Sequence, residues 1–200
     1  MISIYKIKPA FQKLLTPILK ILHKMGVTAN QITWSSIILS LLIGIAFWYA
    51  ETYTLLFLAL PIGLLIRMAL NALDGMMART YNQQTKKGEL LNELGDIISD
   101  LFIFFPLLFF ERHITYVIVA FISLSIINEF AGLLGKIISG ERRYDGPMGK
   151  SDRAFAMGLY GILSLLAIDF KAYSVWIFSA IILLLTISTA IRINKALKAA

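Results

Sequence analysis

The sequence predicts an all-α integral membrane protein with a single domain over residues 1–200. We expect an amphipathic interfacial helix over residues 8–25, followed by a bundle of six transmembrane helices over residues 32–191. Three observations support this fold class. Hydrophobic residues make up 58% of the chain and charged residues only 16%, and the mean hydropathy is +0.76, far above that of an ordinary soluble domain. Several apolar stretches are long enough to cross a bilayer. Lysines and arginines gather between alternate stretches.

The first expected element is the interfacial helix. Apolar residues between Phe11 and Met25 recur three or four positions apart, and lysines fall on the other faces. This pattern is typical of a helix that lies in the membrane interface with its lysines toward anionic headgroups. Gly26 is suited to end this helix, and Thr28 or Asn30 is suited to cap the next one.

Six stretches predict spanning helices, because about 20 apolar residues cross a hydrocarbon core of roughly 30 Å. In chain order they are Ile32–Ala50, Tyr53–Arg79, Gly88–Phe110, Thr115–Ile138, Arg153–Ile168 and Ala172–Ile191. The second and third stretches carry several charged residues. The fifth is short in its uncharged part, so we expect the preceding loop to extend it.

The distribution of positive charge orients the chain. Of the 19 lysines and arginines, Arg112 and Lys171 fall in loops on one side, Arg67 lies within the second predicted span, and all others fall on the opposite side. Loops rich in lysine and arginine face the cytoplasm, so both termini are expected there. This bias accounts for the formal charge of +7 without a nucleic-acid partner. The absence of cysteine excludes disulfides and thiolate metal sites.

A polar pattern interrupts the second and third predicted spans. It reads Asn71-x2-Asp74-Gly75-x2-Ala78-Arg79-x8-Gly88-x3-Asn92-x3-Asp96. Charged groups at membrane depth are costly and are usually functional. Residues three or four apart share a helix face, so a hairpin of the two helices brings Asp74 and Asp96 face to face near the cytoplasmic surface. Oxygen ligands of this kind suit Mg²⁺ or Mn²⁺.

The pattern resembles the signature of the CDP-alcohol phosphotransferase family, D-x2-D-G-x2-A-R-x8-G-x3-D-x3-D, with every interval preserved. Two of the four signature aspartates are replaced, by Asn71 and Asn92. The resemblance implies transfer of a phosphatidyl group from CDP-diacylglycerol to the hydroxyl of a small polar acceptor, with release of CMP. It also implies a homodimer. The charge bias places the motif turn on the cytoplasmic side, so we expect a protein of the cytoplasmic (inner) membrane whose active site faces the cytoplasm.

The resemblance also implies residue roles by position. Asp96 is the expected catalytic base. The expected ligands of Mg²⁺ or Mn²⁺ are Asp74, Asp96, Asn71 and Asn92. The residues expected to contact the CDP moiety are Asn71, Asp74, Gly75, Ala78, Arg79 and Gly88, among which the small residues leave room for a nucleotide near the backbone.

The two asparagines lower the negative charge of a site meant for divalent cations, since an amide offers only a neutral oxygen. We therefore expect an altered, weaker or single-metal site, with Asp100, Glu93 or Glu89 as possible compensation. One alternative is a catalytically inactive relative that binds nucleotide lipid or has a structural role. Another is a small transporter, although the charges cluster at one membrane face and no pair of broken helices recurs in two repeats.

An acceptor pocket is indicated near the turn at residues 145–147. The candidates for binding the acceptor or a phosphate are Lys150, Arg153, Arg142, Arg143, Asn128 and Asp100. Solvated loop charges that fix topology are the alternative for Arg142 and Arg143, and a helix–helix hydrogen bond is the alternative for Asn128. The sequence does not identify the acceptor alcohol. Small residues in the fourth predicted span permit close packing and give weak support for a homodimer; they are Ser123, Ser125, Ala131 and Gly132.

Overall fold

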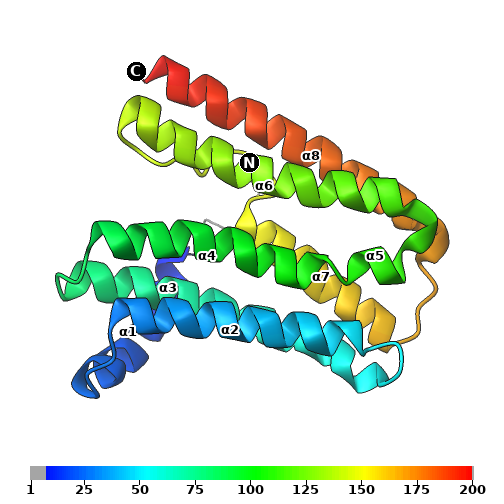
Figure 1. Ribbon diagram of the computed structural model, residues 1–200, viewed down its shortest axis with the longest axis horizontal. Coiled ribbons are helices and arrows are strands. Elements are labelled where there is room, and N and C mark those ends of the chain that lie inside the picture. The colour runs from blue at the N-terminus through cyan, green and yellow to red at the C-terminus, as the bar shows by residue number, and fades with distance from the viewer. Residues whose placement is uncertain (1–7, 200) are drawn as a thin grey trace.

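The computed structural model describes residues 8–199, which form a bundle of helices (Figure 1). The α-helices are α1 (Lys8–Lys24), α2 (Ala29–Trp48), α3 (Leu64–Thr80), α4 (Lys86–Phe104), α5 (Leu107–Phe110), α6 (Thr115–Ser139), α7 (Lys150–Leu165) and α8 (Lys171–Lys198). A 3-10 turn (Thr54–Leu58) and a π-helical turn (Ala59–Gly63) lead into α3, and a 3-10 turn (Arg112–Ile114) leads into α6. The predicted all-helical membrane fold is confirmed.

Four segments within residues 8–199 are long and apolar enough to cross a membrane: Ala29–Trp48, Thr54–Thr80, Arg112–Ser139 and Lys171–Lys198. They correspond to four of the six predicted spans. The other two predicted spans are α4 and α7, which run alongside the four in Figure 1. Neither helix is both long and apolar enough to count among the four, because α4 is rich in acidic residues and α7 has only 16 residues. That they also cross the membrane stays a prediction.

The long helices run up and down the bundle. In Figure 1 the turn between α3 and α4 lies at the same end as the C-terminal ends of α6 and α8, whereas the connection between α2 and α3 lies at the other end. This arrangement agrees with the sidedness that the positive charges predict. α6 packs mainly against α8, and α2 packs against both α3 and α4.

The larger hydrophobic core lies toward the end of the bundle away from the α3–α4 turn. Aromatic rings dominate it: Phe47 is fully buried, stacks on Phe110 with ring centroids 4.7 Å apart, and meets the edge of Tyr160. Such contacts add to the free energy gained from burial. They hold α2, α5 and α7 together at the end opposite the polar motif.

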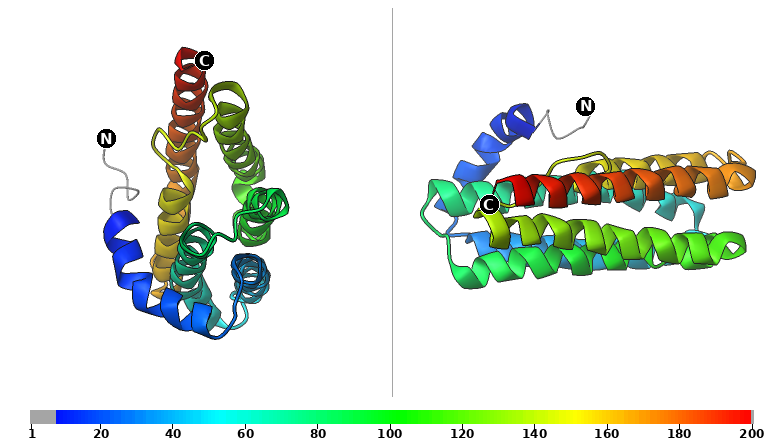
Figure 2. Two further views of the ribbon diagram at one scale, coloured as in Figure 1. Left: turned by 90° about the vertical axis from the view of Figure 1, so that its left-hand side faces the viewer. Right: turned by 90° about the horizontal axis from the view of Figure 1, so that it is seen from above.

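α1 lies at an angle to the bundle, across the end where α3 turns into α4 (Figure 2). Its predicted single apolar face is divided between two environments. Leu15 and Leu19 are buried and belong to a second core with Leu73 of α3. Leu14 and Met25 are 72% and 71% exposed. α1 thus presents apolar surface suited to lipid on one side and positions α3 on the other, while its place in the membrane interface stays a prediction.

The small residues of α6 pack inside the protomer. Ser125, Ala131 and Gly132 are buried, and a Cβ added to Gly132 would lie 2.7 Å from the backbone oxygen of Arg143. Their size lets the α6–α7 loop approach α6 closely. The interpretation of these residues as a dimer surface was therefore wrong for these three positions; of the four residues, only Ser123 is exposed.

Candidate active site

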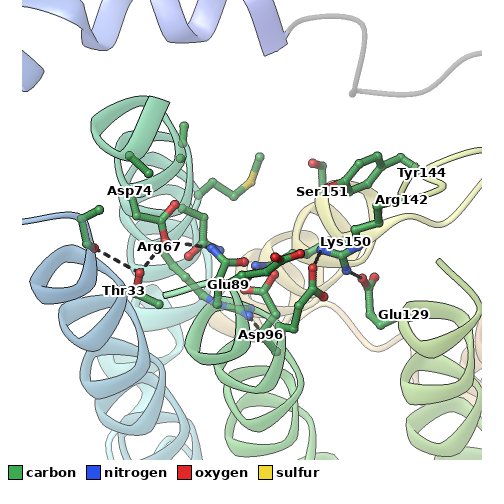
Figure 3. A pocket seen from close by; sticks show the side chains of 18 of the residues that line it. Thr33, Arg67, Asp74, Glu89, Asp96, Glu129, Arg142, Tyr144, Lys150 and Ser151 are labelled. Atoms are coloured by element: carbon green, nitrogen blue, oxygen red, sulfur yellow. Dashed lines mark hydrogen bonds and ion pairs between the residues drawn. The ribbon is translucent and has the colours of Figure 1, made fainter. Parts of the chain in front are cut away.

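A cavity of about 890 Å³ opens at the end of the bundle near the α3–α4 turn (Figure 3). Residues of α1, α2, α3, α4, α6, α7 and α8 line it. All eight specified positions of the polar motif line this cavity: Asn71, Asp74, Gly75, Ala78, Arg79, Gly88, Asn92 and Asp96. The hairpin therefore brings together the residues that the helical spacing predicted to meet.

Asp74 is the most enclosed carboxylate of the motif, with 3% of its surface exposed. Its Oδ2 accepts hydrogen bonds from Thr33 Oγ1 at 3.1 Å and from Asn92 Nδ2 at 3.3 Å. Its Oδ1 is buried and has no hydrogen-bond partner among the described residues. Buried polar atoms are nearly always satisfied, so this oxygen is suited to a cation or a polar ligand.

Two hydroxyl groups of α2, which lie outside the sequence motif, orient this half of the site. Thr33 donates to Asp74, and Ser36 Oγ donates to Asn71 Oδ1 at 2.7 Å. A detectable signal existed: Thr33, Ser36 and Ser40 recur at helical spacing in an otherwise apolar span, which places all three on one face. All three are buried against the motif helices.

The donor set fits one hard divalent cation better than a cluster of cations. In the part of the chain that the structure describes, no group of three or more His, Cys, Asp or Glu side chains is placed to hold a metal ion. Asp74 and Asp96 supply two carboxylates, and the unpartnered Oδ1 of Asp74 is available. Mg²⁺ is typically held by one or two carboxylates together with substrate phosphates and water, which is the arrangement that these residues permit.

Lys150 and Arg142 reach the cavity from the α6–α7 connection, as the sequence predicted. Lys150 is the first residue of α7 and forms an ion pair with Asp96. Arg142 donates to Glu93 Oε1 and to Glu129 Oε2, both at 2.8 Å. Burial lowers the pKa of Arg142, but the negative charge of Glu129 and other neighbouring acidic groups outweighs burial, so the pKa lies above its ordinary value. Figure 3 shows Arg142 and Lys150 on the side of the cavity opposite Asp74.

The structure does not bring Arg153 or Asp100 to the cavity. Arg153 is 1% exposed and donates to Asp100 Oδ2 at 2.8 Å and to Glu129 Oε1 at 2.9 Å. Arg67 pairs with the other oxygen of Asp100 at 2.8 Å. Asp100 is thus enclosed between two guanidinium groups, and it does not compensate for the missing motif carboxylates. Sequence position alone had placed both residues at the acceptor.

Asn128 and Arg143 also lie away from the cavity. Asn128 is fully buried, and its Oδ1 accepts a hydrogen bond from Thr189 of α8 at 3.3 Å. Arg143, in the α6–α7 loop, donates to Ser139 Oγ at the end of α6 at 3.1 Å. The contact of Asn128 corresponds to the alternative that the sequence left open, a helix–helix hydrogen bond. Arg143 is not a solvated loop charge, because it is half-buried against α6 and its Nε is enclosed.

The other end of the cavity carries cations that are free of carboxylates. Arg79, near the C-terminal end of α3, and Lys86, at the start of α4, both line the cavity and form no ion pair within residues 8–199. A Cβ added to Gly75 would lie 3.2 Å from Arg79 Nη1, so the absence of a side chain at Gly75 leaves the guanidinium its place over α3. This end can accept negative charge.

The fold and the motif geometry define a class of protein. Residues 26–196 match the CDP-alcohol phosphatidyltransferase family, and the chain belongs to that family. It is 46% identical over 186 residues to inner membrane protein YnbA of Escherichia coli (strain K12), which covers 92% of each chain. It is also 34% identical over 100 residues to the archaetidylinositol phosphate synthase of Pyrococcus horikoshii, and this match covers 50% of each chain.

Solved structures of phosphatidylinositol phosphate synthase from Mycobacterium tuberculosis share the fold. The complex with manganese and citrate has a TM-score of 0.71 at 19% identity, covering 90% of this chain and 88% of that one. The form with CDP-DAG bound has a TM-score of 0.68 at 20% identity, covering 94% and 93%. At this level of identity the likeness concerns the fold.

Proposed function

We propose that the protein is a CDP-alcohol phosphatidyltransferase of the cytoplasmic membrane, with its cavity facing the cytoplasm. It transfers the phosphatidyl group of CDP-diacylglycerol to the hydroxyl of a small polar alcohol and releases CMP. Family membership, the relative described as an inner membrane protein and the sidedness of the positive charges support this proposal. Family membership also favours an enzyme over a transporter.

The donor occupies the end of the cavity near Arg79 and Lys86, whose free charges suit the diphosphate. Asn71, Asp74, Gly75, Ala78 and Gly88 surround the CDP moiety. Asp74 and Asp96, with the amide oxygens of Asn71 and Asn92, would hold Mg²⁺ or Mn²⁺. When bound, this cation neutralises phosphate charge and orients the leaving group.

Asp96 is the group of this chain that handles the proton. Its carboxylate takes the proton of the acceptor hydroxyl, and the alcohol oxygen forms a bond to the phosphatidyl phosphorus while the bond from that phosphorus to the CMP oxygen breaks. Lys150 fixes the direction of the Asp96 carboxylate before substrates bind. Thr33 and Asn92 fix the Asp74 carboxylate in the same way.

The observation that carries the proposal is that all matched motif positions converge on one cavity. The test is to incubate purified protein with CDP-diacylglycerol, Mn²⁺ and a set of alcohols, and to identify CMP and the lipid product by mass spectrometry. We expect CMP and a new phospholipid in equal amounts, both dependent on the cation. Bound CDP-diacylglycerol that is never converted would contradict the proposal.

A second candidate function has its own structural support. Both motif carboxylates already have protein partners, because Asn92 donates to Asp74 and Lys150 pairs with Asp96. These contacts suit a relative that binds nucleotide lipid without turning it over, and the same assay separates the two functions. A homodimer stays part of the proposal on the family resemblance, with no support from the buried small residues of α6.

A further inference from the structure

The two ends of the cavity differ in whether their cations have carboxylate partners. At the donor end, Arg79 and Lys86 line the cavity and have no acidic partner within residues 8–199. At the opposite end, Arg142 and Lys150 line the cavity, and each is paired with an acidic side chain. The cavity therefore offers free positive charge at only one end.

The pairing of Arg142 uses both terminal nitrogens of its guanidinium. Nη1 donates to Glu93 and Nη2 donates to Glu129, each at 2.8 Å. The Arg142 and Glu129 side chains are 11% and 7% exposed, and Glu93 is 16% exposed. The remaining nitrogen, Nε, is buried and has no hydrogen-bond partner among the described residues. An incoming anion would therefore compete with Glu93 and Glu129 for the terminal nitrogens of Arg142.

Further ion pairs lie next to Arg142, and two of their members, Glu129 and Arg192, line the cavity themselves. Arg153 bridges Asp100 and Glu129, and Arg192 donates to the backbone oxygens of Asn128 and Asp145, with its Nη1 4.0 Å from Glu129. Glu129 is thus surrounded by three guanidinium groups, and each of them also donates to another acceptor. A phosphate could recruit Arg142 only by separating it from Glu93 or Glu129.

That separation is costly. Glu129 would keep Arg153, but Glu93 has no other ion pair among the described residues. A largely buried carboxylate left without its cation destabilises a protein, whereas an intact pair of this kind is close to neutral. An alcohol hydroxyl avoids the cost, because it can donate to Glu93 or Glu129 while Arg142 keeps both partners, and it brings no charge into the cavity. The acceptor end is therefore matched to hydroxyl groups and mismatched to a phosphate.

We propose that the acceptor alcohol is an uncharged polyhydroxy compound that carries no phosphate. This inference rests on the proposed function and names the substrate class of the same site. Glu93 and Glu129 act as specificity residues: they keep Arg142 from binding a phosphorylated acceptor and offer oxygens to the hydroxyls of an uncharged one.

The first test compares matched acceptors in the CMP-release assay: glycerol against glycerol 3-phosphate, and myo-inositol against its 1-phosphate. We expect the unphosphorylated member of each pair to give the lipid product with the higher kcat/KM. Preference for the phosphorylated members would overturn the inference while leaving the proposed function intact. If no acceptor supports CMP release, the proposed function fails, and the binding test that follows decides the inference separately.

The second test measures binding of glycerol 3-phosphate to protein in lipid nanodiscs, with saturating CMP to occupy the donor end. Wild type should bind it weakly. Glu93→Gln releases one side of Arg142, so binding should tighten about tenfold, as expected for one added hydrogen bond between charged groups. Glu129→Gln should act in the same direction and gives a second variant if the first folds poorly.

Glu51→Gln is the matched control, because Glu51 is exposed in the turn after α2, at the far end of the bundle. It removes the same charge without touching Arg142, and it should leave glycerol 3-phosphate binding unchanged. Equal and tight binding by wild type and Glu93→Gln would overturn the inference, because Arg142 would then already be open to phosphate.

Discussion

The ammonium group of Lys150, at the first position of α7, forms an ion pair with the carboxylate of Asp96 in α4. This pair joins the expected base to a cation supplied by the chain itself. In a site where two aspartates are replaced by Asn71 and Asn92, Lys150 contributes positive charge where a divalent cation would bind. Lys150 and a metal ion therefore compete for the same carboxylate.

The competition predicts a gain of metal affinity on removing Lys150. In Lys150→Met, Mn²⁺ should bind the donor-free protein about tenfold more tightly, because a unit positive charge a few ångströms away contributes at least 1.4 kcal/mol of repulsion at roughly the effective dielectric of a partly buried site. Electron paramagnetic resonance titration of Mn²⁺ measures the change. Lys136→Met is the control, since Lys136 pairs with the exposed Glu89. Equal affinities in Lys150→Met and wild type would exclude the competition.

Restoring the two aspartates should make the protein depend on metal for stability. In wild type the amide of Asn92 donates to Asp74, whereas an aspartate at that position would repel it. Asn71→Asp combined with Asn92→Asp should lower Tm in the presence of a chelator and raise the Tm gain from Mn²⁺. Activity need not rise, because tighter ground-state binding does not by itself favour the transition state. A variant with unchanged Tm and Mn²⁺ affinity would show that these positions do not face the cation.

Asp74→Ala should abolish binding of CDP-diacylglycerol that depends on Mn²⁺. Asp74 supplies the buried oxygen without a hydrogen-bond partner, and it is the carboxylate that α3 contributes to the motif. Titration of Mn²⁺ with and without CDP-diacylglycerol in nanodiscs tests this expectation. Thr33→Val should give a smaller loss, since it removes one of the two hydrogen bonds that orient Asp74. Unchanged metal affinity in Asp74→Ala would show that Asp74 has a packing role and is not a metal ligand.

Arg153→Met should destabilise the fold. It leaves Asp100 and Glu129 without a cation that lies 2.8–2.9 Å away, and breaking a buried ion pair costs about 3–5 kcal/mol. Thermal unfolding in detergent should show a clear fall in Tm, while Arg143→Met, which loses only a hydrogen bond to Ser139, should show little change. A stable Arg153→Met protein that has lost only acceptor affinity would contradict this structural role and support Arg153 as an acceptor-binding residue.

The sequence predicted the motif half of the site well, because that half depends on local geometry. The intervals between Asn71, Asp74, Asn92 and Asp96 place them on facing sides of two helices joined by a short turn, and all four line the cavity. Helical period and chain connectivity suffice for this result. The roles of these residues stay predictions.

The acceptor half could not be predicted in the same way, because it depends on how α7 is rotated about its axis. Lys150 and Arg153 are three positions apart, yet Lys150 lines the cavity and Arg153 is enclosed behind it. The rotation of α7 is set by contacts with a distant segment: a Cβ on Gly161 would lie 2.8 Å from Leu60 Cβ and from the Phe57 backbone oxygen. No period within α7 encodes that packing.

The most direct measurement is the rate of CMP release from CDP-diacylglycerol by wild type and by Asp96→Asn, each purified and supplied with Mn²⁺ and an alcohol acceptor. We predict that Asp96→Asn stays folded, still binds CDP-diacylglycerol and releases no CMP, because an amide cannot take the proton of the hydroxyl. Asp169→Asn, the same chemical change in the exposed turn before α8, should keep the wild-type rate. Wild-type turnover by Asp96→Asn would contradict the assignment of the base and, with it, the proposed mechanism.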